Sequence, residues 1–176
     1  NIIGNTSISD ELHVSNSVGI GTKNPLSKLH IIGDAIITSN TNILSNLNIS
    51  NNANILGNIN INEQLFVLNN GNIFGNLNVL GNTNINEELF VKSNANMLGN
   101  LNVIGNLNLS DRLYVKDNVI VENNANIFAN LNVVGNTNID KELFVLSNAN
   151  MLANLNVIGN VNLSERLYVK DNVIVG

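Results

Sequence analysis

The sequence of 176 residues contains no cysteine, no tryptophan and a single proline. Without cysteine, the chain forms neither a disulfide framework nor a Cys-ligated zinc site. Only 12% of residues are charged, and 13 acidic residues outnumber eight basic ones. The net charge of −5 excludes the broadly basic surface typical of nucleic-acid binding. Aromatic residues make up 4% of the chain, and the few ionisable groups do not form the clusters expected of an enzyme.

Long hydrophobic runs are missing as well. Apolar runs such as Leu65–Leu68 stop after four residues, whereas a membrane-spanning helix needs about 20. We therefore expect no membrane insertion. The chain begins with Asn1 and shows no signal-peptide pattern, so we expect a fragment or a processed piece of a longer protein.

Asparagine is the most abundant residue, with 43 copies, and a repeat of six residues places most of them. From Ile31 to Val175, every sixth residue is aliphatic, which gives 25 consecutive repeats. The residue two positions before each aliphatic one is always apolar or small. A typical unit is Asn76–Gly81, with the sequence NLNVLG. A period this regular indicates a stacked repeat architecture.

Two inward side chains separated by one outward side chain follow the alternation of a β-strand. The Gly-Asn pair that follows is typical of a turn, because both residues tolerate positive φ. Asn, Gly and β-branched residues all disfavour a helix. We therefore predict an all-β fold, a β-helix built of hexapeptide repeats with layers about 4.8 Å apart. Asn side chains at equivalent positions are expected to form amide ladders along it.

One break in the register divides the chain. Residues 1–20 are predicted to form N-terminal β-helical hexads, and residues 21–28, which contain Pro25, a loop or kink. Residues 29–176 are predicted to form a continuous hexapeptide-repeat β-helix. From residue 82 a longer repeat of 54 residues is superimposed on the hexads, so that the residues around Phe90 return around Phe144.

The residue after each inward aliphatic residue is often apolar, although strand alternation directs it outward. Such residues are Leu56, Phe74, Leu80, Leu98, Ile104, Phe128, Val134, Leu146, Leu152 and Ile158. In a single-chain solenoid with 18-residue coils they would form an exposed stripe, which soluble monomers rarely carry. The aromatic residues that stand between two inward positions are 24 or 30 residues apart, so they would also scatter over different faces; they are Phe66, Phe90, Tyr114, Phe144 and Tyr168. Both observations favour an intertwined parallel homotrimer, in which each chain supplies one face of every layer; the single-chain solenoid is the alternative.

Acidic residues recur in the turns that precede the hexads with a central Phe or Tyr, and paired carboxylates can act as general acid and base. We interpret them instead as solvated corners that form ion pairs between layers with Arg112, Lys141 and Arg166. The carboxylates concerned are Glu63, Glu87, Glu88, Asp111, Glu142 and Glu165.

Other candidates for chemistry are isolated. His13 and His30 occupy strand positions expected to face outward; a ring of histidines could bind a metal across a trimer, but the inward positions are aliphatic. Gly19-Ile20-Gly21 is not followed by a helix, so it does not predict a phosphate loop. Glycosylation sequons, which this many Asn produce by chance, occur at Asn5, Asn48, Asn108 and Asn162.

The aromatic residues at the centres of the predicted strands are open to two interpretations. The rings could stack on sugars, but they are more simply explained by packing over a neighbouring layer or chain. They belong to Phe66, Phe90, Tyr114, Phe144 and Tyr168. Altogether we predict no catalytic, cofactor-binding or metal-binding residue, no cofactor and no enzymatic activity.

Residues 18–33, with the sequence VGIGTKNPLSKLHIIG, resemble the VGIGTxxPxxKLHVxG segment of phage and large-virus tail-fibre proteins. The Asn-rich hexads are similar to shaft repeats of fibre-like proteins of large DNA viruses. The resemblance implies a trimeric shaft that stands ahead of a receptor-binding tip or a chaperone domain. Neither of these domains is recognisable in the sequence, so we expect contact with a host receptor only through regions outside this segment.

The expected function is therefore that of a structural fibre shaft on the surface of a virion, which self-associates and projects a receptor-binding tip. The alternative is a single-chain β-solenoid that stacks end to end into an extracellular filament or adhesin. An acyltransferase-type left-handed β-helix enzyme is a third hypothesis. It is disfavoured because its hexapeptides carry a small residue where this chain often has Leu, and because few loops are available to build a cleft.

Overall fold

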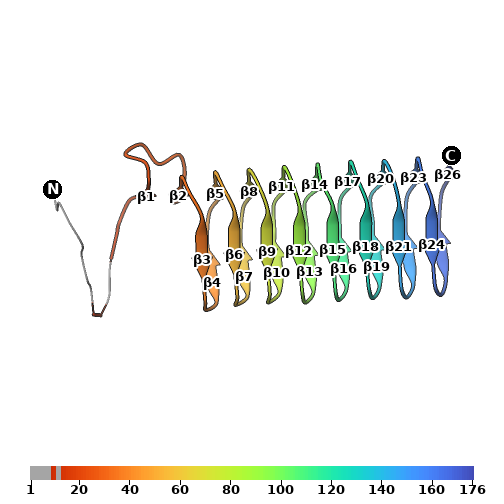
Figure 1. Cartoon of the computed structure of the whole chain (residues 1–176), viewed down its shortest axis with the longest axis horizontal. Helices are drawn as coiled ribbons and strands as arrows, with labels where there is room; N and C mark the ends of the chain where they lie inside the picture. Colours follow the sequence, from red (N-terminus) through yellow and green to blue (C-terminus); the bar gives the residue numbers. More distant parts are fainter. Residues whose placement is uncertain (1–8, 11–12) are drawn as a thin grey trace.

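The structure is a computed structural model that describes residues 9–10 and 13–176. Within them the chain forms 26 parallel β-strands of three residues each and no helix. Figure 1 shows the strands stacked into a straight rod, with β2 (Leu29–Ile31) near one end and β26 (Val173–Val175) at the other. Three successive strands complete one coil, so strands β3 to β26 build eight coils. At about 4.8 Å per layer, these coils extend over roughly 38 Å.

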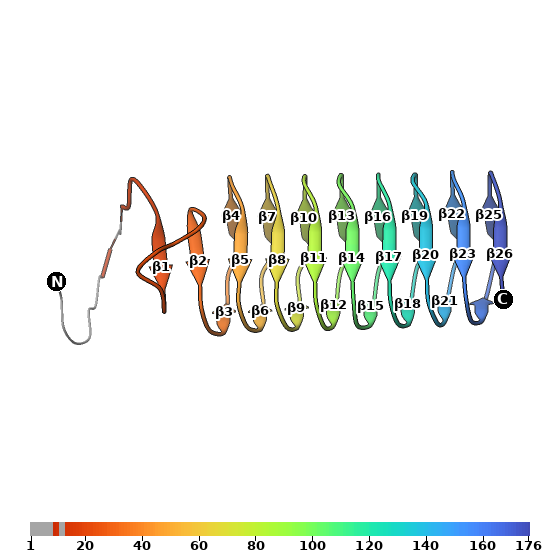
Figure 2. The ribbon, with the colours of Figure 1, turned by 90° about the horizontal axis from the view of Figure 1, so that it is seen from above.

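Each coil contributes one strand to each of three parallel sheets, A, B and C (Figure 2). Sheet A contains β1 (Val18–Ile20), β2 (Leu29–Ile31), β5 (Leu47–Ile49), β8 (Leu65–Val67), β11 (Thr83–Ile85), β14 (Leu101–Val103), β17 (Val119–Val121), β20 (Thr137–Ile139), β23 (Leu155–Val157) and β26 (Val173–Val175). Sheet B contains β3 (Ala35–Ile37), β6 (Ala53–Ile55), β9 (Gly71–Ile73), β12 (Leu89–Val91), β15 (Leu107–Leu109), β18 (Ala125–Ile127), β21 (Leu143–Val145) and β24 (Val161–Leu163). Sheet C contains β4 (Thr41–Ile43), β7 (Ile59–Ile61), β10 (Leu77–Val79), β13 (Ala95–Met97), β16 (Leu113–Val115), β19 (Leu131–Val133), β22 (Ala149–Met151) and β25 (Leu167–Val169).

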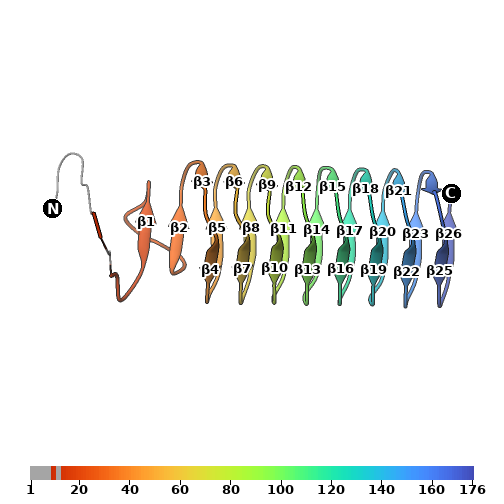
Figure 3. The same cartoon turned by 90° about the horizontal axis from the view of Figure 1, so that it is seen from below.

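From β2 onward, the pairing register is constant: each residue lies beside the residue 18 positions later. Leu77 pairs with Ala95, and Val79 pairs with Met97. The ladder continues past the strand ends, because Leu77 N donates to Asn94 O at 3.0 Å and Leu80 N to Ile61 O at 3.0 Å. Figure 3 shows the coils in the same orientation along the rod. A parallel β-solenoid with three sheets confirms the predicted all-β β-helix.

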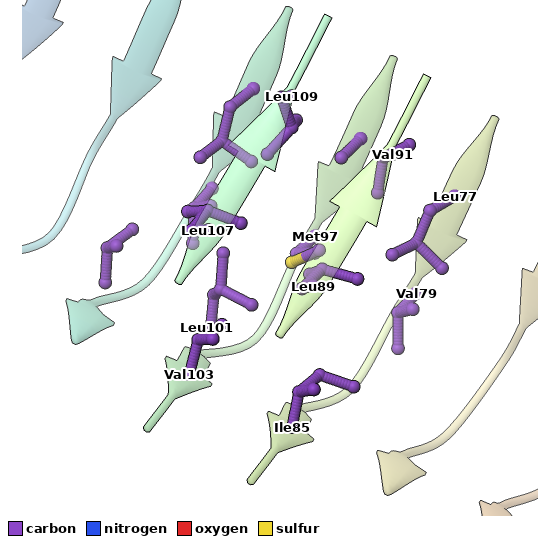
Figure 4. Close-up of a cluster of buried hydrophobic side chains, with 14 of the residues drawn as sticks. Leu77, Val79, Ile85, Leu89, Val91, Met97, Leu101, Val103, Leu107 and Leu109 are labelled. Carbon is purple, nitrogen blue, oxygen red and sulfur yellow. The ribbon is translucent and has the colours of Figure 1, made fainter. Parts of the chain in front are cut away.

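The core is a column of inward side chains. All 25 aliphatic residues of the six-residue repeat are the last residues of strands β2 to β26. Most of them are buried, and Figure 4 shows Leu77, Val79 and Met97 among the side chains that point into the space between the sheets. Full burial of such a side chain stabilises the fold by about 1.5–3 kcal/mol. Since the column continues through every coil, each coil is stabilised by the coils above and below it.

The corners differ from the prediction. Among the described residues, positive φ occurs only at Gly21 (73°) and Gly33 (137°), so the Gly-Asn corners do not use it. At the corner glycines the backbones of successive coils approach each other closely. A Cβ on Gly81 would lie 2.3 Å from Glu63 O, and one on Gly105 would lie 2.3 Å from Glu87 O. The corner glycines therefore serve packing between layers.

The rod begins differently from the way it continues. Strand β1 pairs with β2, and the residues between them, which include Pro25, contain no strand and loop out at one end of the rod (Figure 2). Of the hexads expected in residues 1–20, those at Ile2 and Ile8 lie outside the described residues. Val14 is described and lies in no strand.

One chain completes every coil in this structure, as in the single-chain alternative. The aromatic rings accordingly lie on all three sheets: Phe66 on A, Phe90 and Phe144 on B, and Tyr114 and Tyr168 on C. The 54-residue repeat equals three 18-residue coils, so it returns each side chain to the same sheet. The outward apolar row is exposed as that geometry requires, with its ten members between 39% and 59% exposed.

Candidate functional site

The outer surface of the rod consists of three faces and three corners. The faces carry the central residue of each strand. The corners carry the three residues that link a strand to the next one, and we name them A–B, B–C and C–A after the sheets that they join. With no catalytic or metal site predicted, these repeated surfaces are the places where function could lie.

Asparagine ladders run along the corners. In corner C–A, six Asn residues are stacked in successive coils, and five hydrogen bonds link them. Each bond runs from the backbone N–H of one Asn to Oδ1 of the Asn 18 residues earlier, as from Asn100 to Asn82 at 2.9 Å and from Asn136 to Asn118 at 2.8 Å. The ladder comprises Asn82, Asn100, Asn118, Asn136, Asn154 and Asn172. These bonds confirm the predicted ladders and satisfy corner N–H groups that the sheets leave free.

A second set of ladders runs along the faces, where amide side chains bond to one another. On sheet C, Asn60 Nδ2 donates to Asn42 Oδ1 at 2.7 Å, and the chain of bonds continues through Asn78 to Asn96. Tyr114 ends this ladder because its ring occupies the next position. On every face an apolar or aromatic residue therefore limits the length of the amide ladder.

The charge of the chain is concentrated on corner A–B. Six acidic residues and one basic residue, Lys141, lie in this corner, and these seven residues account for the whole net charge of −5. The acidic residues are Asp34, Glu87, Glu88, Glu122, Asp140 and Glu142. The other seven acidic and seven basic residues of the sequence cancel. Sequence analysis missed this asymmetry, because it appears only when residues are sorted with the 18-residue period of the coil.

The six carboxylates considered as candidate acids and bases are divided among three corners, so the fold does not bring them together as a set. Their contacts are with hydroxyl and amide groups one coil away. Ser45 Oγ donates to Glu63 at 3.3 Å, and Ser147 Oγ donates to Glu165 at 3.2 Å. Asn108 donates to Glu88, and Asn160 donates to Glu142 at 3.4 Å. Ion pairs with Arg112, Lys141 and Arg166 are not among these contacts.

The two histidines are in different environments. His13 is exposed, as expected. The expectation that His30 faces solvent is wrong, since the side chain is only 7% exposed. Strand alternation places it on the outer side of sheet A, but the preceding loop covers it, and Leu26 N donates to its Nδ1 at 3.2 Å. His30 therefore anchors the loop.

The aromatic residues fall into two groups. Phe90 packs against Phe74 with ring centroids 5.9 Å apart, and Phe144 packs against Phe128 at 5.8 Å. These pairs agree with the packing interpretation. Phe66, Tyr114 and Tyr168 are not part of an aromatic pair among the described residues, and Tyr168 is 54% exposed.

A groove lies on the outer face of sheet C beside Tyr168, with a volume of about 650 Å³. Its lining residues are Asn130, Asn132, Asn148, Asn150, Arg166, Leu167 and Tyr168. A second groove of about 270 Å³ shares Asn132 and Asn150 and reaches Tyr114 and Leu152. The two tyrosines thus stand at opposite ends of one amide-lined strip.

The remaining motifs show no chemistry of their own. Gly19 lies in β1 and Gly21 in the loop, with no helix after them. Asn5 lies outside the described residues. The other three sequon asparagines are central residues of strands, and Asn108 Oδ1 accepts a ladder bond from Asn126 at 2.9 Å.

Within residues 9–10 and 13–176, no three His, Asp or Glu side chains are grouped closely enough to hold a metal ion. Over the same residues, the chain has no helix suited to crossing a bilayer. Comparison with protein-family models, with curated proteins and with solved structures found no match to this chain.

Proposed function

We propose that this chain is the shaft of a structural fibre on the surface of a virion, with no catalytic activity of its own. The observation that carries the proposal is the uninterrupted stack of coils from β2 to β26 around one aliphatic column. Such a stack extends a chain along one axis and holds whatever follows it at a distance. The tail-fibre resemblance of residues 18–33 supports a position on a virus particle outside the cell.

The physical properties of the rod suit a spacer. The backbone N–H and C=O groups bond to neighbouring coils, and the corner N–H groups bond to Asn ladders, so bending requires many bonds to break together. The central column between the sheets is filled by aliphatic side chains. A host receptor would then be contacted through regions outside this segment.

The second candidate for assembly is the intertwined parallel homotrimer. The outward apolar row favours it, because association of chains would cover side chains such as Leu80, Leu98 and Leu152 that are exposed in one chain. End-to-end stacking of single-chain rods into an extracellular filament is the remaining alternative.

Three measurements test these proposals. Multi-angle light scattering of the purified chain gives its mass: a monomer with the circular-dichroism spectrum of a β-protein supports one chain per coil, and a trimer supports the second candidate. Electron microscopy separates individual rods from end-to-end filaments. The virion location is tested by gold-labelled antibodies against the chain. Label along projecting fibres of the particle supports it, and particles without label overturn it.

A further inference from the structure

The strip between the two tyrosines of sheet C has a defined chemical pattern. Tyr114, Asn132, Asn150 and Tyr168 are the central residues of four successive strands, and each lies directly beside the next. The outer face therefore presents an aromatic ring, two amides and a second ring in a line parallel to the rod. Three coils separate the rings, which is about 14 Å.

The two amides between the rings are incompletely bonded. Asn150 Nδ2 donates to Asn132 Oδ1 at 3.0 Å. Because tyrosines occupy the positions on either side, the ladder ends there: among the described residues, Asn132 Nδ2 and Asn150 Oδ1 have no further side-chain partner. By contrast, Asn78 on the same sheet uses both groups, since Asn60 accepts from it at 2.8 Å and Asn96 donates to it at 2.9 Å.

The edges of the strip complete a shallow site. Val134 and Leu152 form an apolar margin along corner C–A, and Arg166 with Asn148 lies on the opposite side. The volume of the larger groove, about 650 Å³, falls within the range of roughly 300–1,000 Å³ that is typical of ligand sites. The site is thus rich in amides, with two rings and with the guanidinium of Arg166 as its one charged group.

We propose that this strip binds a neutral oligosaccharide that lies parallel to the rod. The face of an aromatic ring carries negative charge density and attracts the C–H groups of a pyranose ring. The free donor of Asn132 and the free acceptor of Asn150 match sugar hydroxyls, which both donate and accept. A ligand with several sugars spans the two tyrosines, and Arg166 donates to its margin.

Other ligand classes fit this strip less well. A nucleic acid would meet a single cation on a chain of net charge −5, whereas phosphate binding needs several. An extended peptide binds by adding a strand to a free sheet edge, but the strip lies on the face of a sheet whose strands are already paired on both sides up to β22.

In the first test, the full chain is titrated with cellohexaose, maltohexaose, mannohexaose and chitohexaose, and binding is measured by calorimetry and NMR. We expect at least one of them to bind. Replacement of Tyr168→Asn is expected to weaken that binding about tenfold or more, because one ring of the site is lost. The fold should tolerate this variant, since Asn60 occupies the equivalent central strand position of the same sheet, two 54-residue intervals before Tyr168. Asn132→Ala weakens binding, and its matched control, Asn78→Ala, leaves it unchanged.

The second test moves the site. Asn60→Tyr introduces a ring three coils before Tyr114, with Asn78 and Asn96 between them. In a chain that also carries Tyr168→Asn, this change should restore binding, and binding should now depend on Asn78 instead of Asn132. Absence of binding by all four hexasaccharides overturns the proposal. So does binding by the native chain that Tyr168→Asn leaves unchanged, or failure of Asn60→Tyr to restore it in a chain of native circular dichroism.

Discussion

Corners C–A and A–B connect strands of the same length in the same solenoid, yet their side chains behave differently. Corner C–A carries an unbroken ladder of six Asn residues, from Asn82 to Asn172. In corner A–B, Glu88 and Glu142 take the Asn position in every third coil. Their own backbone N–H groups donate to the Asn of the preceding coil, at 3.0 and 3.2 Å, but among the described residues no backbone N–H of the next coil donates to their carboxylates.

The difference shows what a ladder needs. The side chain of Asn is one methylene shorter than that of Gln or Glu, and at this length its oxygen can accept from the backbone N–H of the next coil. Gln64 in corner C–A has the amide chemistry but the greater length, and among the described residues its oxygen accepts no bond from Asn82 N. Length therefore decides whether the ladder continues, and corner A–B, whose ladder is interrupted by Glu88 and Glu142, also carries the net charge.

The largest loss of stability is expected from substitutions of corner glycines, and it should be similar in the two corners because their backbones approach the preceding coil equally closely. Gly81→Ala in corner C–A and Gly105→Ala in corner A–B each place a Cβ 2.3 Å from a backbone oxygen of the preceding coil. Both should therefore lower the free energy of unfolding by about 2–3 kcal/mol, as overpacking does. Urea unfolding followed by circular dichroism measures the loss. Ala153→Gly is the control, because that corner already holds a methyl group. Clearly unequal losses would mean that the two corners differ in backbone as well as in side chains.

Lengthening one ladder residue should destabilise the chain more in corner C–A than in corner A–B. Asn118→Gln in corner C–A removes the acceptor that Asn136 N uses at 2.8 Å and the 3.2 Å bond to Asn100. The expected loss is about 1–2 kcal/mol of unfolding free energy, since the N–H of Asn136 is left without a partner. Asn106→Gln in corner A–B is the matched change, and it should cost less because its single ladder bond, from Asn124 N, is 3.4 Å long. Equal losses from the two changes would refute the explanation by ladder continuity.

Repair of the interrupted ladder should stabilise the chain. In Glu142→Asn, the shorter side chain can accept from the backbone N–H of Asn160, which adds about 0.5–1 kcal/mol to the unfolding free energy. Thermal unfolding of the variant should therefore show a higher midpoint. Asp140→Asn removes a charge from the same turn outside the ladder position. If Asp140→Asn stabilises the chain as much, the gain comes from charge and the ladder account fails.

The smallest expected effect is that of salt. The six acidic residues of corner A–B repel one another, and raising the salt from about 0.01 to 0.15 M shortens the screening length from about 30 to 8 Å. The thermal midpoint should rise slightly, and it should rise less in Glu142→Asn. Asp117→Asn in corner C–A, where acidic and basic residues are mixed, should keep the salt response of the native chain. If Glu142→Asn and Asp117→Asn reduce the salt dependence of the thermal midpoint equally, the salt dependence does not originate in corner A–B.

The period of six predicted the strands and the core because burial imposes it directly. An inward position must be apolar in every coil, so the aliphatic residues from Ile31 to Val175 mark strand ends without knowledge of the fold. The Asn ladders were predicted on the same basis, since identical residues at identical positions stack wherever layers repeat. The outward apolar row also lies where alternation places it in a single-chain solenoid.

Other features depend on distances that the sequence does not contain. The corner glycines were assigned to positive φ, but the structure shows that they leave room for a carbonyl oxygen of the preceding coil. His30 was expected to face solvent because strand alternation gives only the side of the sheet and does not show that the preceding loop covers that side. The tyrosine strip was missed because the 54-residue repeat, although recognised, was not related to an 18-residue coil, of which it contains three.

By itself, then, the sequence determined the strand alternation, the aliphatic column and the stacking of asparagines, because each follows from the local rule that inward positions are apolar and repeated positions coincide. The tertiary structure alone decided which hexads share a face. It closed the coil at 18 residues, which gathers the acidic residues in one corner and aligns Tyr114 with Tyr168. Three hexads per coil is a property of how the corners turn and pack, and no single hexad encodes it.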